Sequence, residues 1–140
     1  MRQFVLLALF AVCFVGCRTP TTDPTETVVT GEVLLDGKAL TMGEVYFENE
    51  SGTKSGLGDI NADGKYRVAS APVGPVKAAV RTSNHAQFAG TKTKEGKTVT
   101  VGGREGTYVA VPKRYEEVST SKLTYTLTKD AVIKIELTTK

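Results

Sequence analysis

Three acidic or amide residues, Asp59, Asn61 and Asp63, have the spacing of a calcium-binding loop. With Gly64 they match the first half of an EF-hand, D-x-N-x-D-G. A complete EF-hand also needs an acidic ligand at the twelfth loop position and a helix on each side. The twelfth position is Ser70, and the flanking segments have the pattern of strands. We therefore expect a tight turn here and no metal site, with calcium binding as the alternative.

His85 is the only histidine of the chain and the obvious candidate for acid–base catalysis. Ser83, Ser119 and Asp130 could complete a Ser-His-Asp set by composition, but no nucleophile-elbow pattern accompanies them. A zinc site usually draws several His and Cys ligands. We expect His85 to be a solvated loop residue, and we expect a protein with no catalytic residue and no cofactor.

The glycine-rich stretch Gly102–Gly106 lacks the Lys-Ser/Thr pair of a phosphate-binding loop and any helix after it. A turn explains these residues better. The 18 basic and 15 acidic side chains are mixed along the chain. Because a nucleic-acid binder usually has a clustered basic stripe, the charge pattern argues against such a partner.

The candidates for a contact surface are Tyr108, Lys113, Arg114 and Tyr115. The two cations could bind an acidic group while the Tyr115 ring stacks on it. The interpretation that we favour is that Tyr115 closes one end of the fold and the charges face water. Binding of a small ligand or carbohydrate would require exposed aromatic rings on one face, and Tyr46, Tyr108 and Tyr115 are the candidates.

The first 16 residues have the pattern of a secretory signal. Arg2 supplies a positive charge, and the apolar run Phe4–Val15 is shorter than the roughly 20 residues that span a bilayer as a helix. The residues after it, 17–27, are rich in Thr and Pro and predict a flexible tether.

The sequence Phe14–Cys17 resembles the lipobox of bacterial lipoproteins. This resemblance implies cleavage before Cys17, a diacylglyceryl thioether on its sulfur and an acylated amino group. Arg18, in place of Asp after the cysteine, implies the outer membrane of a double-membrane cell. The alternative is an ordinary secretory signal in which this cysteine is incidental.

The remainder, residues 28–140, alternates apolar and polar residues in short runs separated by Gly, Pro and Asp turns. Clear alternation with many β-branched residues predicts strands, and the stretch Gly31–Asn49 contains the clearest pair. We expect an all-β domain, a seven-stranded antiparallel β-sandwich preceded by the signal helix and tether. Residues 83–106 are the least regular and have room for one irregular hairpin, and residues 114–118 for one helical turn. The expected strands are Val28–Leu35, Gly43–Glu48, Lys54–Ile60, Lys65–Ala69, Val76–Thr82, Thr98–Val101, Tyr108–Val111, Leu123–Leu127 and Ala131–Leu137.

Several motifs of this region resemble the carboxypeptidase regulatory-like domain found in small bacterial lipoproteins. The resemblance implies a transthyretin-like sandwich over residues 28–138 that serves as an accessory, structural or binding module. Transthyretin-like hydrolases use several histidines and a C-terminal Tyr-Arg-Gly-Ser, neither of which occurs here. The matching stretches are Thr30–Val33, Leu35–Leu40, Gly43–Phe47, Asp63–Tyr66, Pro72–Val80, Val111–Tyr115 and Ser119–Leu123.

The sequence thus favours a non-enzymatic lipoprotein, anchored through Cys17 and facing the periplasm or the cell surface. Its β-sandwich would act as an interaction or envelope-structural module. Edge strands and residues 83–122 are the expected contact surfaces, because unpaired strand edges can accept a partner's strand. The alternative function is a small-ligand or carbohydrate-binding module of the envelope.

Overall fold

A computed structural model describes residues 27–86 and 96–140 of the chain. This part of the chain is an all-β domain, as predicted; the signal segment and Cys17 lie outside it. Short helical segments are α1 (Ser83–Ala86), η2 (Lys113–Tyr115) and α2 (Val118–Ser121). The strands are β1 (Val28–Leu35), β2 (Lys38–Ala39), β3 (Gly43–Asn49), β4 (Ser55–Ile60), β5 (Lys65–Ala69), β6 (Gly74–Arg81), β7 (Lys97–Val101), β8 (Arg104–Tyr108), β9 (Leu123–Leu127) and β10 (Val132–Leu137).

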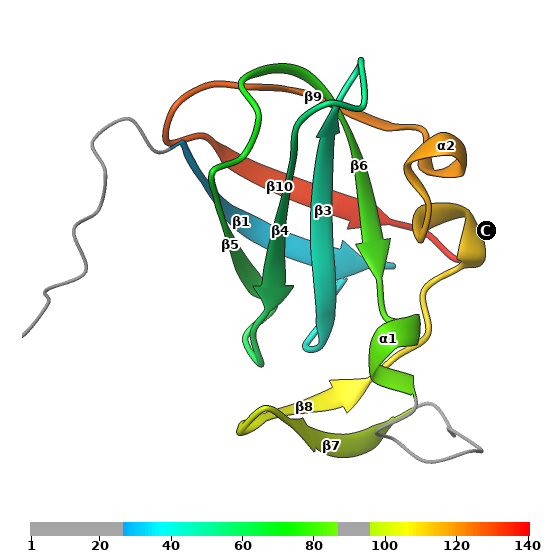
Figure 1. Ribbon diagram of the computed structural model, residues 1–140. Coiled ribbons are helices and arrows are strands. Elements are labelled where there is room, and N and C mark those ends of the chain that lie inside the picture. The colour runs from blue at the N-terminus through cyan, green and yellow to red at the C-terminus, as the bar shows by residue number, and fades with distance from the viewer. Residues whose placement is uncertain (1–26, 87–95) are drawn as a thin grey trace, which may run out of the picture.

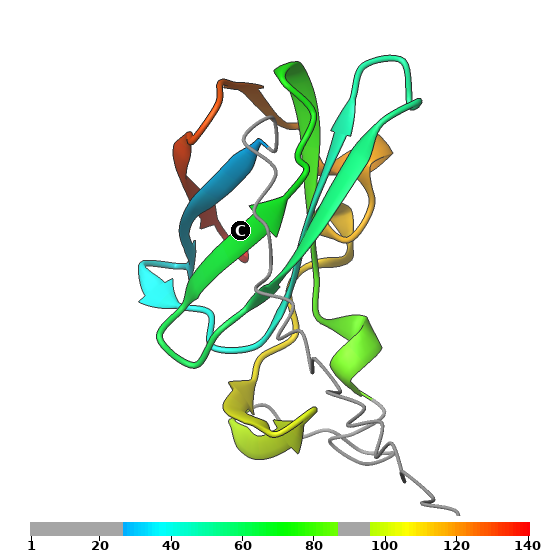
Figure 2. The same cartoon turned by 60° about the vertical axis from the view of Figure 1, so that its left-hand side comes forward.

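Seven strands follow one another in the order β10-β1-β5-β4-β3-β6-β9, with β2 paired to β1. Strands β4 and β5 share a single residue pair, Ile60 with Tyr66, so the sheet folds over at this point. The result is a sandwich with β10, β1 and β5 in one layer and β4, β3, β6 and β9 in the other (Figures 1 and 2). The antiparallel arrangement is broken once, because β1 and β10 run parallel.

The core lies between the two layers and is built from the alternate residues of each strand. On β3, Val45 and Phe47 are fully buried, and on β6 Val76, Ala78 and Val80 are buried as well. The Phe47 ring lies 6.1 Å from the Tyr66 ring and 6.4 Å from the Tyr125 ring, centroid to centroid. Burial of each large apolar side chain contributes about 1.5–3 kcal/mol to folding, which holds the layers together without a disulfide.

Gly31 on β1 allows a close approach that no other residue would permit. A Cβ atom at this position would lie 1.8 Å from the Ile133 carbonyl oxygen. The Tyr66 side chain crosses over the glycine, and its hydroxyl donates a hydrogen bond of 2.8 Å to the same oxygen. Gly31 of β1 therefore lets Tyr66 of β5 hydrogen-bond to β10, which joins the three strands into one layer.

The poorly patterned region contains the hairpin that was expected there. Strands β7 and β8 pair antiparallel, with Val101 opposite Arg104 across the two-residue turn Gly102-Gly103. Both glycines have positive φ, 57° and 78°, as the favoured two-residue hairpin turns require. The expected strand Tyr108–Val111 is wrong, because its first residue instead ends β8. The expected helical turn at residues 114–118 is divided between η2 and α2.

Candidate functional site

The hairpin β7–β8 is fastened to the lower end of the sandwich through the loop that precedes β3 (Figure 1). The Thr41 hydroxyl accepts a hydrogen bond from the Thr107 N–H, 3.0 Å, and donates one to the Thr107 carbonyl, 3.1 Å. Gly106 lets β8 approach the loop before β3, since a Cβ there would lie 2.5 Å from the Thr41 carbonyl oxygen. These contacts fix the hairpin against the sandwich.

A small apolar cluster, separate from the main core, supports the same junction. Met42, Val99 and Tyr108 are all buried in it, and Ala86 and Val101 pack against them. Because the cluster joins α1, the hairpin and the β3 loop, it positions all three around the end of β4.

A salt bridge links the hairpin to β4. The Arg104 guanidinium donates to the Asp59 carboxylate. The Arg104 and Asp59 side chains remain 58% and 48% exposed, so the pair contributes little to stability. Its effect is to hold a cation and an anion at the mouth of the junction.

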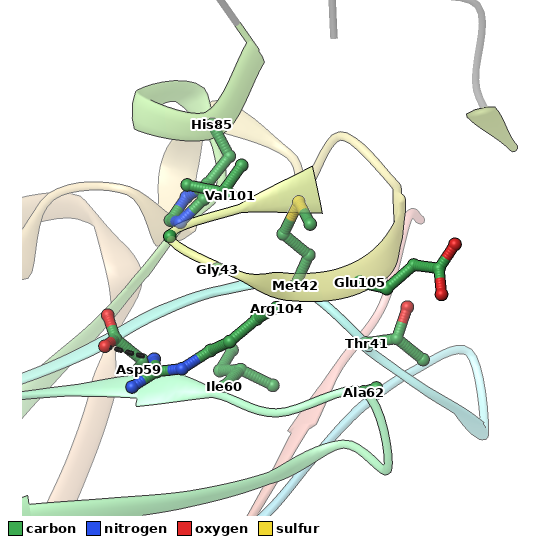
Figure 3. Close-up of a pocket in the computed structure, with 11 residues that line it drawn as sticks. Thr41, Met42, Gly43, Asp59, Ile60, Ala62, His85, Val101, Arg104 and Glu105 are labelled. Carbon is green, nitrogen blue, oxygen red and sulfur yellow. Dashed lines mark hydrogen bonds and ion pairs between the residues drawn. The ribbon is translucent and has the colours of Figure 1, made fainter. Parts of the chain in front are cut away.

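These contacts enclose a cavity of about 210 Å³ (Figure 3). Its apolar wall includes Met42, Ile60 and Val101, and its polar wall includes Asp59 and Arg104. His85 also lines it and reaches toward it from α1 in Figure 3. We call this cavity the hairpin pocket. Gly102 of the hairpin turn and Thr41 of the loop before β3 also line the pocket.

His85 differs from the solvated loop residue that was expected, and that prediction is wrong. The residue lies in α1 and is half-buried. Its Nδ1 atom is buried and has no hydrogen-bond partner among the described residues. A buried polar atom without a partner is costly, and either an ordered water or a bound molecule could supply the hydrogen bond.

The hairpin pocket has the chemistry of a binding site for a small polar molecule. Asp59 can accept hydrogen bonds, Arg104 can donate them, and the apolar wall can exclude water. The Thr41 hydroxyl, which also lines the pocket, is already bonded to the Thr107 backbone. The lining includes neither Ser nor Cys. The described lining therefore contains neither of the two commonest nucleophilic side chains.

The calcium-like stretch forms the turn that was expected. The Gly64 N–H donates to the Asn61 carbonyl, 2.9 Å, and Gly64 has a φ of 79°. Asp63 pairs with Lys65 at 3.6 Å, whereas Asp59 belongs to β4 and pairs with the hairpin. Within the described ranges, no group of three or more His, Cys, Asp or Glu residues is placed to hold a metal ion.

The four residues of the expected contact surface do not form one surface. Tyr108 is 6% exposed in the hairpin cluster, and Tyr115 is 7% exposed in the main core. Lys113 and Arg114 are exposed beside Tyr115. The favoured interpretation of Tyr115, that it closes one end of the sandwich, is the arrangement observed.

Arg114 and Tyr115 bind the C-terminal segment instead of leaving a site open. The Arg114 guanidinium lies over the Tyr115 ring, 4.7 Å from its centroid, and donates to the Thr138 carbonyl. Burial by itself raises the pKa of the Tyr115 hydroxyl. Three effects outweigh burial and lower the pKa overall: the hydrogen bond from Arg114, the hydrogen bond from the Thr138 N–H, and the positive charge of Arg114.

Tyr46 does not join the other two tyrosines. It is half-buried on β3, its hydroxyl donates to Glu48 at 3.0 Å, and the Arg81 guanidinium lies 4.8 Å from its ring centroid. The three tyrosines therefore lie in three different environments. They do not provide the shared aromatic face that carbohydrate stacking would require.

The residues that line the hairpin pocket were not grouped by the sequence. Asp59 was assigned to the end of the strand Lys54–Ile60, His85 to a loop and Arg104 to a glycine-rich turn. In the sequence these residues share one feature, a charged or titratable side chain next to a glycine turn or an irregular segment. This feature does not indicate that they lie close together, because they meet only when the hairpin docks on the sandwich.

Within the part of the chain that the structure describes, no helix is long and apolar enough to cross a membrane.

No protein-family profile matches the chain, and no curated protein matches its sequence. One similar solved structure is BcpA, the major pilin subunit of Bacillus cereus, with 12% identity and a TM-score of 0.40 over 82% of this chain and 30% of the pilin. Its D312A variant has 16% identity and a TM-score of 0.34 over 81% of this chain and 28% of the other. The chain thus spans less than a third of the pilin, and likeness at this level carries no argument about function.

Proposed function

We propose that this protein is a non-enzymatic lipoprotein module of the bacterial envelope, anchored through Cys17 and of the carboxypeptidase regulatory-like type. One observation carries the proposal. In Figure 1 the start of β1 lies at the upper end of the sandwich, and the hairpin lies below its lower end. An anchor attached before Val28 therefore leaves the hairpin end free to meet a partner.

The sequence supports the anchor. Arg2, the short apolar run and Cys17 follow in the order of a lipoprotein signal, and the folded domain begins at Val28. A lipidated cysteine with several acyl chains would bind a membrane stably, whereas a single chain binds only marginally. Arg18 favours the outer membrane, with the sandwich facing the periplasm or the cell surface.

The distribution of tyrosines favours an interaction module over a carbohydrate binder. Exposed rings on one face would have supported sugar stacking, whereas Tyr108 and Tyr115 are buried. The surface at the hairpin end carries charged side chains, with those of Asp59 and Arg104 about half exposed. Such a surface suits recognition of another envelope protein through polar contacts.

A second function, binding of a small polar molecule, is favoured by the hairpin pocket itself. The cavity of about 210 Å³ and the buried, unpartnered Nδ1 of His85 are the specific observations. The two functions are compatible, because a small molecule in the pocket would stabilise the hairpin that a partner contacts.

Anchoring is tested by expressing the full chain in a double-membrane bacterium and separating membrane from soluble fractions. The unaltered chain should partition with the membrane, and Cys17→Ser should not, because the acceptor sulfur is lost. Cys13→Ser is the matched control and should behave like the unaltered chain, since Cys13 lies within the signal. Equal partitioning of the Cys17→Ser and Cys13→Ser variants would refute the anchor.

A further inference from the structure

Strand β10 forms one edge of its layer. In the part of the chain that the structure describes, it pairs only with β1, to which it runs parallel. An unpaired edge presents a row of backbone N–H and C=O groups that another strand can use.

The hydrogen bonds to β1 identify which backbone groups remain free. The Ala131 carbonyl accepts from the Thr30 N–H at 3.0 Å, and the Leu137 carbonyl accepts from the Asp36 N–H at 2.9 Å. Because successive residues of a strand direct these groups to opposite sides, Ile133 and Ile135 face β1 in the same way. Val132, Lys134 and Glu136 therefore direct their backbone groups outward.

The side chains at this edge are open to solvent on the outer face. Val132 is 78% exposed, and the side chains of Lys134 and Glu136 are 51% and 69% exposed. The Lys134 ammonium lies 2.9 Å from Glu136 and 3.8 Å from Glu32. A cation and an anion thus stand two residues apart on one exposed strand.

We propose that β10 pairs antiparallel with β10 of a second copy of this chain, about a two-fold axis at Ile135. This register places Lys134 of each copy opposite Glu136 of the other. Both residues direct their backbone groups outward, so they form the hydrogen-bonded pairs of the new ladder. The proposal goes beyond the function proposed above, because the contact needs neither the lipid nor the hairpin pocket.

Charge selects this register over its neighbours. An axis at Lys134 would oppose two lysines, and an axis at Glu136 would oppose two glutamates; like charges directly opposite destabilise a strand pair. The axis at Ile135 gives two attractive pairs instead. On the inner face it also sets Ile133, which is half-buried, opposite Leu137 of the second copy, which is already buried in its own core.

The opposite edge of the sandwich offers no such selection. Strand β9 has the sequence LTYTL and carries no charged residue.

The test uses charge reversal in the full chain, purified in detergent and studied by sedimentation velocity over a range of concentrations. The unaltered chain should dimerise. Lys134→Glu alone and Glu136→Lys alone each replace two attractive pairs by two repulsive ones. The dimer dissociation constant of each variant should therefore rise by about tenfold or more. An equimolar mixture of the two variants should form a heterodimer, because every opposed pair then attracts.

Two further proteins keep the result interpretable. The double variant Lys134→Glu/Glu136→Lys restores both attractive pairs and should dimerise like the unaltered chain. Thr126→Glu, on the exposed face of β9, is the matched control and should leave dimerisation unchanged. The proposal is overturned if the unaltered chain stays monomeric, if a single reversal dimerises as tightly as the unaltered chain, or if the mixture does not associate.

Discussion

At the scale of single residues, Tyr66 combines three roles in the sandwich. Its ring packs against Phe47, covers the backbone at Gly31 and places its hydroxyl on the Ile133 carbonyl. Burial raises the pKa of this hydroxyl above its usual value. The stability of the layer formed by β10, β1 and β5 therefore depends on whether the Tyr66 hydroxyl keeps its proton.

This coupling predicts a loss of stability at alkaline pH. The unfolded chain releases the tyrosine proton at pH ~10, whereas the folded chain holds it to higher pH, so stability is complete below pH ~10 and falls above it. Tyr66→Phe should lose about 0.5–1.5 kcal/mol at neutral pH with the hydrogen bond, yet show a flatter decline in alkali. Urea denaturation at a series of pH values measures both effects.

Tyr115→Phe serves as the contrast, because hydrogen bonds from Arg114 and Thr138 lower the pKa of the Tyr115 hydroxyl. Its removal should not flatten the alkaline decline. If Tyr66→Phe declines as steeply as the unaltered chain, the role assigned to Tyr66 is wrong.

Single residues could be predicted where local geometry decides them. The turn at Asn61–Gly64 follows from the need for positive φ, and it forms as expected. The burial of Tyr108 could not be predicted, because it depends on Met42 and Val99, which reach it only when the hairpin docks. His85 was misjudged for the same reason.

At the scale of elements, the hairpin β7–β8 is a small unit with its own sheet and its own apolar cluster. It depends on the sandwich for docking, and Thr41 supplies both hydrogen bonds to the Thr107 backbone. The junction should therefore loosen before the sandwich unfolds.

Thr41→Val tests this dependence, because it keeps the shape of the side chain and removes the hydroxyl. Unpaired Thr107 backbone groups should cost the docked state about 1–3 kcal/mol, which corresponds to amide hydrogen exchange at Thr107 faster by about five- to 150-fold. Exchange in β3 and β6 should change little. Thr107→Val is the matched control, since only the backbone of Thr107 bonds to Thr41; equal exchange in the two variants would contradict the assignment.

The strands with clear alternation could be predicted, among them β1, β3, β9 and β10. Strand β8 was missed because Arg104, Glu105 and Gly106 offer no apolar alternation; the glycine is there for close approach to Thr41. The parallel pairing of β1 with β10 could not be read either. The pairing depends on which strand the chain returns to. The alternation of apolar and polar residues does not reveal this, because it is the same whether a strand runs parallel or antiparallel to its neighbour.

At the scale of the whole molecule, the all-β sandwich follows from the number and spacing of its strands. The hairpin pocket does not, since it gathers residues from the β3 loop, the end of β4, α1 and the hairpin. Long-range docking brings these segments together, and no local pattern records it. The proposed dimer adds a second level of organisation, in which two three-stranded layers become one continuous sheet.

The proposed lipid anchor determines where the whole molecule resides, and the cysteine content allows a direct test of it. The sequence has two cysteines, Cys13 and Cys17, so a chain cleaved before Cys17 and acylated on its sulfur contains no free thiol. The measurement is the intact mass of the chain isolated from a double-membrane bacterium, before and after treatment with a maleimide. We predict a chain that begins at Cys17, carries the added mass of acyl groups and takes up no maleimide. A chain that begins at Cys17 without added mass and takes up one maleimide would contradict the anchor and leave a freely secreted sandwich.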